Sequence, residues 1–124
     1  MKTDRPVNLN IFTISFPFVA IVSITHRITG VALFVGIGFA LYALQIALAS
    51  PQGFAEAQAL VKTPFGIFVF LGLLFVMVFH VLAGLKHLLL DFHMGDTLDA
   101  ARNGAVFVAV GSIVGTAVLG AMLW

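Results

Sequence analysis

The sequence predicts an all-α fold, an integral membrane bundle of three transmembrane helices, from its composition and from the spacing of its charges. Of the 124 residues, 61% are hydrophobic and only 9% are charged, and the mean hydropathy is +1.15. Ordinary soluble domains carry about 25% charged residues. A small soluble protein has too much surface to cover with so few polar side chains. The lipid bilayer is therefore the solvent that this composition fits.

Three strongly apolar tracts contain no charged residue, residues 28–55, 63–85 and 103–124, and each is more than 20 residues long. A helix that crosses about 30 Å of hydrocarbon needs roughly 20 apolar residues. We therefore expect a single membrane-anchor domain over residues 1–124, with an interfacial segment at 1–27 and a turn at 49–53. The expected transmembrane helices lie at about 28–49, 65–86 and 103–123. Ladders of glycine in the first and third of these indicate close helix packing.

The basic residues predict the orientation. Five of the six lie in the N-terminal segment or between the second and third spans, namely Lys2, Arg5, Arg27, Lys86 and Arg102, whereas Lys62 lies between the first two spans. Basic residues favour the cytoplasmic side. The N-terminus is therefore expected in the cytoplasm and Trp124 at the opposite membrane face, where it would be an interfacial anchor.

Charge and cysteine content exclude several functions. The net charge of +1 does not indicate a nucleic-acid partner, and the chain has no cysteine. Disulfides, thiolate metal sites and covalent attachment of a c-type haem are therefore excluded.

Polar side chains gather at the expected cytoplasmic entrance of the first span. Ser23 and Arg27 stand four residues apart and share a helical face, with His26 beside them. A hydroxyl, an imidazole and a guanidinium in this position suit a ligand with carbonyl or carboxylate oxygens. The alternative is that Arg27 only reaches to the lipid headgroups, as arginines that flank a membrane span commonly do.

A second stripe runs along the end of the second span. Its members follow one another at steps of four, three and four residues, and they are His80, Gly84, His87 and Asp91. His80 lies inside an apolar span, where a polar group is costly and a functional role is the default. A neutral imidazole is a good axial ligand for haem iron, although an interhelical hydrogen bond is the alternative. Gly84 would leave room for a flat macrocycle or a close helix. His87 and His93 are expected at the surface.

The two groups together resemble the cytochrome b membrane-anchor subunit of succinate dehydrogenase (respiratory complex II). That family begins with R-P and continues with S-x-x-H-R-x-S/T-G, which here are Arg5-Pro6 and the segment from Ser23 to Gly30. It also contains H-x-x-x-G-L/I-R-H followed by an aspartate, here His80 to His87 and then Asp91. Lys86 stands where the family usually has arginine, which puts a contact that needs a planar guanidinium in doubt.

The resemblance implies a role for each matching residue. His80 would be an axial ligand of a b-type haem shared with a second anchor subunit. Ser23 and Arg27, with Asp91, would line the ubiquinone site, and His26 and Arg27 would lie near the haem propionates. The physical chemistry agrees, because Ser23 can donate to a quinone carbonyl and a guanidinium suits carboxylates.

The resemblance also implies partners. A flavoprotein would oxidise succinate, an iron–sulfur protein would pass the electrons to quinone, and the whole assembly would lie in the bacterial inner membrane, in contact with lipid. This chain has no flavin fingerprint and no cysteine cluster, so it is not expected to oxidise succinate itself. The alternatives are a fumarate reductase anchor, or a structural or transport subunit without haem.

Overall fold

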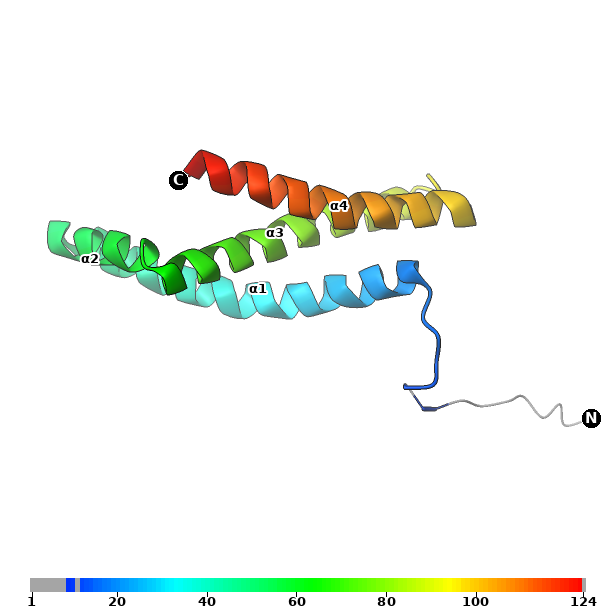
Figure 1. Cartoon of the computed structure of the whole chain (residues 1–124), viewed down its shortest axis with the longest axis horizontal. Coiled ribbons are helices and arrows are strands. Elements are labelled where there is room, and N and C mark those ends of the chain that lie inside the picture. The colour runs from blue at the N-terminus through cyan, green and yellow to red at the C-terminus, as the bar shows by residue number, and fades with distance from the viewer. Residues whose placement is uncertain (1–8, 11, 124) are drawn as a thin grey trace, which may run out of the picture.

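Four helices account for nearly all of the described chain in the computed structural model (Figure 1), which describes residues 9–10 and 12–123. The helices are α1 (Phe18–Ala49), α2 (Pro51–Val61), α3 (Pro64–Asp91) and α4 (Leu98–Leu123). The Arg5-Pro6 pair and the expected anchor Trp124 lie outside the described residues.

Three of these helices, α1, α3 and α4, are long and apolar enough to cross a membrane. The predicted three-span helical membrane fold is therefore confirmed. A helix that runs from Pro17 into the first span is expected, since proline suits a first turn. α1 begins at Phe18, with Pro17 extended ahead of it. With 32 residues, α1 is about 48 Å long at 1.5 Å per residue. It therefore extends well beyond a hydrocarbon layer of about 30 Å.

The turn expected at 49–53 is only one residue long, and a short helix that the sequence analysis did not predict follows it. Ser50 is extended, and α2 starts at once with Pro51. The Ser50 hydroxyl accepts a hydrogen bond of 2.9 Å from the N–H of Gly53. At Gly53 a Cβ would collide with the carbonyl oxygen of Ile46, so glycine lets α2 fold back closely on the end of α1.

The same chemistry recurs at the corner between α2 and α3. Thr63 caps α3 by accepting a 3.0 Å hydrogen bond from the N–H of Gly66, and Pro64 occupies the first turn. A Cβ at Gly66 would collide with the carbonyl oxygen of Leu60. Both corners thus combine a hydroxyl N-cap, a proline whose fixed φ suits the first turn, and a glycine at a close backbone approach.

α3 ends in a Schellman motif. The N–H of Met94 bonds the carbonyl of Leu89, and the N–H of His93 bonds the carbonyl of Leu90, both at 2.9 Å. His93 takes the left-handed conformation (φ 58°) that this motif requires. The exposed loop histidine therefore helps to end α3, and the chain then turns into α4.

α3 packs against both α1 and α4, and it runs between them in the view of Figure 1. A small core joins the three helices near the end of α3 that carries the histidines, and its members are Val22, Phe79, Ala83, Ala105 and Val108. The glycines of α4 face side chains of α3, since Gly111 meets Leu82, Gly115 meets Val78 and Gly120 meets Leu71. This contact agrees with the packing role that the glycine ladder indicated.

Candidate functional site

The candidate site forms where α1 and α3 run antiparallel, with a histidine and a glycine of each helix facing those of the other. His26 and Gly30 lie one turn apart on α1, and His80 and Gly84 lie one turn apart on α3. A Cβ built on Gly30 would lie 3.1 Å from Cε1 of His80, and one built on Gly84 would lie 3.5 Å from Nε2 of His26. Each glycine therefore makes room for the imidazole of the opposite helix. The imidazole of His26 occupies the space beside Gly84.

Three imidazoles follow one another across the two helices. The rings of His26 and His80 are stacked, with centroids 4.2 Å apart and planes at 25°. His26 also contacts the ring of His87. The centroids of these two rings are 5.3 Å apart and their planes are at 42°. His87 is half-buried, although the sequence favoured a surface position for it. Its step of seven residues from His80 places it on the face of α3 that carries the stripe, and that face packs against α1.

The hydrogen bonds of His80 define which ring nitrogen carries its proton. Nδ1 lies 3.1 Å from the carbonyl oxygen of His26 and 3.0 Å from Oγ1 of Thr29. A carbonyl oxygen can only accept, so Nδ1–H is the donor. In a neutral imidazole the lone pair is then on Nε2, which has no hydrogen-bond partner among the described residues.

This arrangement fits haem ligation. Histidines that bind a metal generally donate their other ring N–H to a carbonyl or carboxylate, which fixes the tautomer and the orientation of the ring. His80 has that bond, and its Nε2 has the lone pair that iron requires. The carbonyl that accepts this bond belongs to His26, whose ring stacks on that of His80. Arg27 is exposed one residue further on, which suits contact with a charged carboxylate at the edge of the site.

Ser23 and Arg27 lie on α1 as predicted, and Asp91 lies at the last residue of α3. Ser23 is half-buried, and in the described part of the chain its hydroxyl has no hydrogen-bond partner. The hydroxyl of Thr25, by contrast, donates to the carbonyl of Ile21 at 2.9 Å. Arg27 and Asp91 are both exposed and, among the described residues, form no ion pair with each other. All three side chains therefore lie at the same end of the α1–α3 pair.

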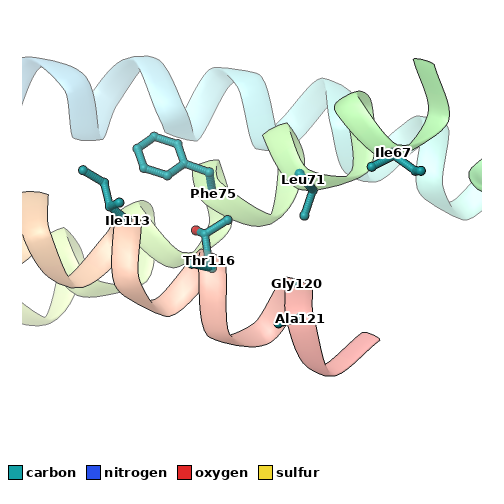
Figure 2. Close-up of a pocket in the computed structure, with 8 residues that line it drawn as sticks. Ile67, Leu71, Phe75, Ile113, Thr116, Gly120 and Ala121 are labelled. Carbon is teal, nitrogen blue, oxygen red and sulfur yellow. The ribbon is translucent and has the colours of Figure 1, made fainter. Parts of the chain in front are cut away.

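An apolar groove between α3 and α4 lies further toward the C-terminal end of α4, away from the histidines (Figure 2). It is lined by Ile67, Leu71, Phe75, Ile113, Thr116, Ala117, Gly120 and Ala121. Its hydroxyl, on Thr116, donates to the carbonyl of Ser112 at 2.7 Å. Because the groove has no ionisable side chain, it offers nothing for haem iron or for the reduction of a quinone.

Several known proteins are similar to this chain over most of its length. Residues 1–119 match the family model described as succinate dehydrogenase/fumarate reductase transmembrane subunit. The succinate dehydrogenase cytochrome b556 subunit of Paracoccus denitrificans is 34% identical over 91% of this chain and 87% of its own length. The subunit of that name from Coxiella burnetii is 33% identical over the full length of both chains. The mitochondrial cytochrome b560 subunit of Sus scrofa is 30% identical over 98% of this chain and 73% of its own.

The family match over residues 1–119, the similar relatives and the three spans lead to one conclusion. The chain belongs to the family of succinate dehydrogenase/fumarate reductase transmembrane subunits, and it is a cytochrome b-type membrane anchor of complex II.

Proposed function

We propose that this subunit holds a b-type haem through His80 and forms part of the site where ubiquinone is reduced by succinate dehydrogenase. The observation that carries the proposal is the hydrogen bond of 3.1 Å between Nδ1 of His80 and the carbonyl oxygen of His26. It leaves the lone pair of the ring on Nε2, the nitrogen that would bind iron. A bound haem would supply a one-electron redox centre inside the membrane.

The protein residues would hold and orient this group. His80 would provide one ligand of the haem iron, and the second anchor subunit would provide another. His26 and Arg27 are consecutive residues of α1, and the ring of His26 stacks on that of His80. In this position they would bind the propionates. The half-buried ring of His26, stacked on His80, would also keep water away from the ligand.

Ser23, Arg27 and Asp91 would serve the quinone. The hydroxyl of Ser23, which has no hydrogen-bond partner among residues 9–10 and 12–123, suits donation to a quinone carbonyl. The exposed guanidinium of Arg27 would stabilise negative charge that develops on that oxygen during reduction. Asp91, at the end of α3, lies at the same end of the helix pair and could take part in proton delivery. The same arrangement would serve a fumarate reductase working in the opposite direction.

The apolar surface of the transmembrane helices would be covered by lipid and by partner subunits. Large apolar side chains remain exposed along the spans, for instance Phe34 and Phe39, which are 84% and 71% exposed. Lipid and the second anchor subunit would cover them. The iron–sulfur and flavoprotein subunits would dock on the side that carries Ser23 and Arg27, in the bacterial inner membrane.

Substitution of His80 tests the haem assignment in the purified complex. In the His80→Ala variant we expect the low-spin b-type absorption spectrum to be lost or strongly altered while the subunit still inserts and assembles. His93→Asn is the matched control. His93 lies in the exposed loop after α3, and asparagine tolerates its left-handed conformation (φ 58°) while removing the imidazole, so the spectrum should equal the parental one. An unchanged spectrum in His80→Ala would show that the ligand is another residue, and absence of haem from the parental complex would favour a structural or transport role.

A further inference from the structure

We propose that Thr29 is a positioning residue that orients the ring of His80, keeps the proton on its Nδ1 and thereby lowers the reduction potential of the haem. This inference rests on the proposed ligation by His80. It concerns the Ser/Thr position of the motif that runs from Ser23 to Gly30, to which the resemblance assigned no role.

Thr29 is one of two buried polar residues in the described chain, with 5% of its surface exposed. Its Oγ1 donates a hydrogen bond of 2.8 Å to the carbonyl oxygen of His26 and lies 3.0 Å from Nδ1 of His80. Polar groups inside a membrane span are costly, and a functional role is the default for them. The contacts of the Thr29 hydroxyl with His26 and His80 indicate what that role is.

Only one proton arrangement satisfies all three contacts. Nδ1 of His80 also lies 3.1 Å from the carbonyl oxygen of His26. If Nδ1 had no proton, its lone pair would face that of the carbonyl. With the proton on Nδ1, the N–H is shared between the carbonyl oxygen and Oγ1 of Thr29, while the hydroxyl proton of Thr29 points at the carbonyl. The three groups thus form a closed hydrogen-bonded triangle that fixes the tautomer.

Local geometry holds Thr29 in this role. Its side chain is β-branched and therefore restricted at χ1, and its bond to the carbonyl three residues earlier restricts it further. The next residue, Gly30, lets the His80 ring approach closely. The hydroxyl of Thr29 is thus in place before haem binds, and the ring of His80 need not be reoriented.

An acceptor on Nδ1–H makes an imidazole a stronger electron donor through Nε2. A stronger donor stabilises ferric iron more than ferrous iron, so it lowers the reduction potential. Removal of the Thr29 hydroxyl leaves the carbonyl of His26 as the remaining acceptor. The donor strength of His80 should then fall without loss of the ligand itself.

The test is a spectroscopic redox titration of the haem in the whole purified complex, for Thr29→Val, Thr29→Ser and a control. Thr29→Val keeps the shape and removes the hydroxyl, and Thr29→Ser restores it. Thr25→Val is the matched control, since its hydroxyl bonds only the carbonyl of Ile21 on the same helix. We expect a more positive potential in Thr29→Val, up to about 59 mV if the preference for ferric iron falls tenfold in this one-electron couple. Thr29→Ser and Thr25→Val should remain near the parental value.

Loss of haem from assembled Thr29→Val, with haem retained in Thr29→Ser, would also support the proposal, since the hydroxyl would then be needed to hold the ligand. A parental potential in Thr29→Val overturns it, and so does a Thr29→Ser variant that behaves like Thr29→Val, because the role would then be steric. The failure of the proposed function is distinguishable: in that case His80→Ala keeps the parental spectrum, whatever Thr29 does.

Discussion

His26 contributes to the candidate site in two separable ways. Its backbone carbonyl accepts hydrogen bonds from Thr29 and from His80, and its imidazole stacks on the imidazole of His80. A substitution at this position removes the ring but leaves the carbonyl. The hydrogen-bonded triangle that orients His80 therefore does not depend on the identity of residue 26, whereas any contact of the ring with a haem propionate does.

At Ser23 and Arg27 we predict effects on quinone turnover. Loss of a neutral hydrogen bond costs about 0.5–1.5 kcal/mol and loss of a charged donor about 1.5–3 kcal/mol. In a complex that reduces quinone, Ser23→Ala should therefore lower kcat/KM roughly two- to tenfold, and Arg27→Leu should lower it by roughly tenfold or more. Succinate oxidation with an artificial acceptor that bypasses quinone should stay close to the parental rate in both variants.

Arg102→Leu provides the control for charge, because Arg102 is exposed near the start of α4 and belongs to the same predicted cytoplasmic side. It should reduce quinone at the parental rate. Parental quinone kinetics in both Ser23→Ala and Arg27→Leu would show that Arg27 is an anchor at the membrane surface. An equal loss in Arg102→Leu would show that surface charge, rather than a specific contact, is what matters.

At the scale of elements, the register between α1 and α3 decides which residues meet. Gly30 and Gly84 are the positions where each helix approaches a histidine ring of the other, and the approach at Gly30 is the closer one. A Cβ at Gly30 would lie 3.1 Å from the ring of His80, whereas one at Gly84 would be in ordinary contact with His26 at 3.5 Å. The ring of His80 must therefore shift if residue 30 gains a methyl group, and its hydrogen bonds shift with it.

Gly30→Ala should accordingly lower the haem content of the assembled complex or alter its low-spin spectrum. Gly38→Ala on the same helix is the matched control, because a Cβ there meets nothing within 4 Å, and alanine favours a helix over glycine by about 1 kcal/mol. Absorption spectra of both purified variants give the comparison. An altered spectrum in Gly38→Ala, with a parental spectrum in Gly30→Ala, would mean that the α1–α3 contact does not control the ligand.

Elements differed in how far the sequence could predict them. The three long helices follow from charge-free tracts, and the structure has them. The charge-free tracts do not predict α2, because its 11 residues are too few to cross a membrane and lie between two spans. The signal was present, since Ser50-Pro51 and Thr63-Pro64 are each a hydroxyl N-cap followed by a proline.

Within the site, periodicity could place His80, Gly84 and His87 on one face of a helix. It could not show that Gly84 faces His26, or that Thr29 bonds Nδ1 of His80, because those contacts depend on how two helices are aligned with each other. A single sequence contains the period of each helix but not the register between them. The assignment of Ser23, Arg27 and Asp91 to quinone stays a prediction.

At the scale of the whole molecule, exposed apolar side chains cover the spans, and the candidate site lies at one end of the helices. The groups that would meet quinone and haem are at the start of α1 and the end of α3 (Figure 1). The α2 corner and the end of α4 lie at the opposite end. The side of the membrane on which each end lies therefore decides whether a cytoplasmic iron–sulfur protein can reach the site.

We predict that the loop between α3 and α4 faces the cytoplasm and that α2 faces the opposite side, from the five-to-one bias of basic residues. The chain has no cysteine, so single cysteines can be labelled with a membrane-impermeant maleimide in spheroplasts and read on this subunit's own gel band. Asp96→Cys suits the loop, since Asp96 is exposed there, and it avoids Gly95, whose φ of 77° disfavours a side chain. Glu56→Cys, exposed on α2, is the counterpart.

Glu56→Cys should be labelled in intact spheroplasts, and Asp96→Cys only after permeabilisation. The reverse pattern would put Ser23 and Arg27 on the face opposite the cytoplasmic partners, and the quinone assignment would fail with the topology.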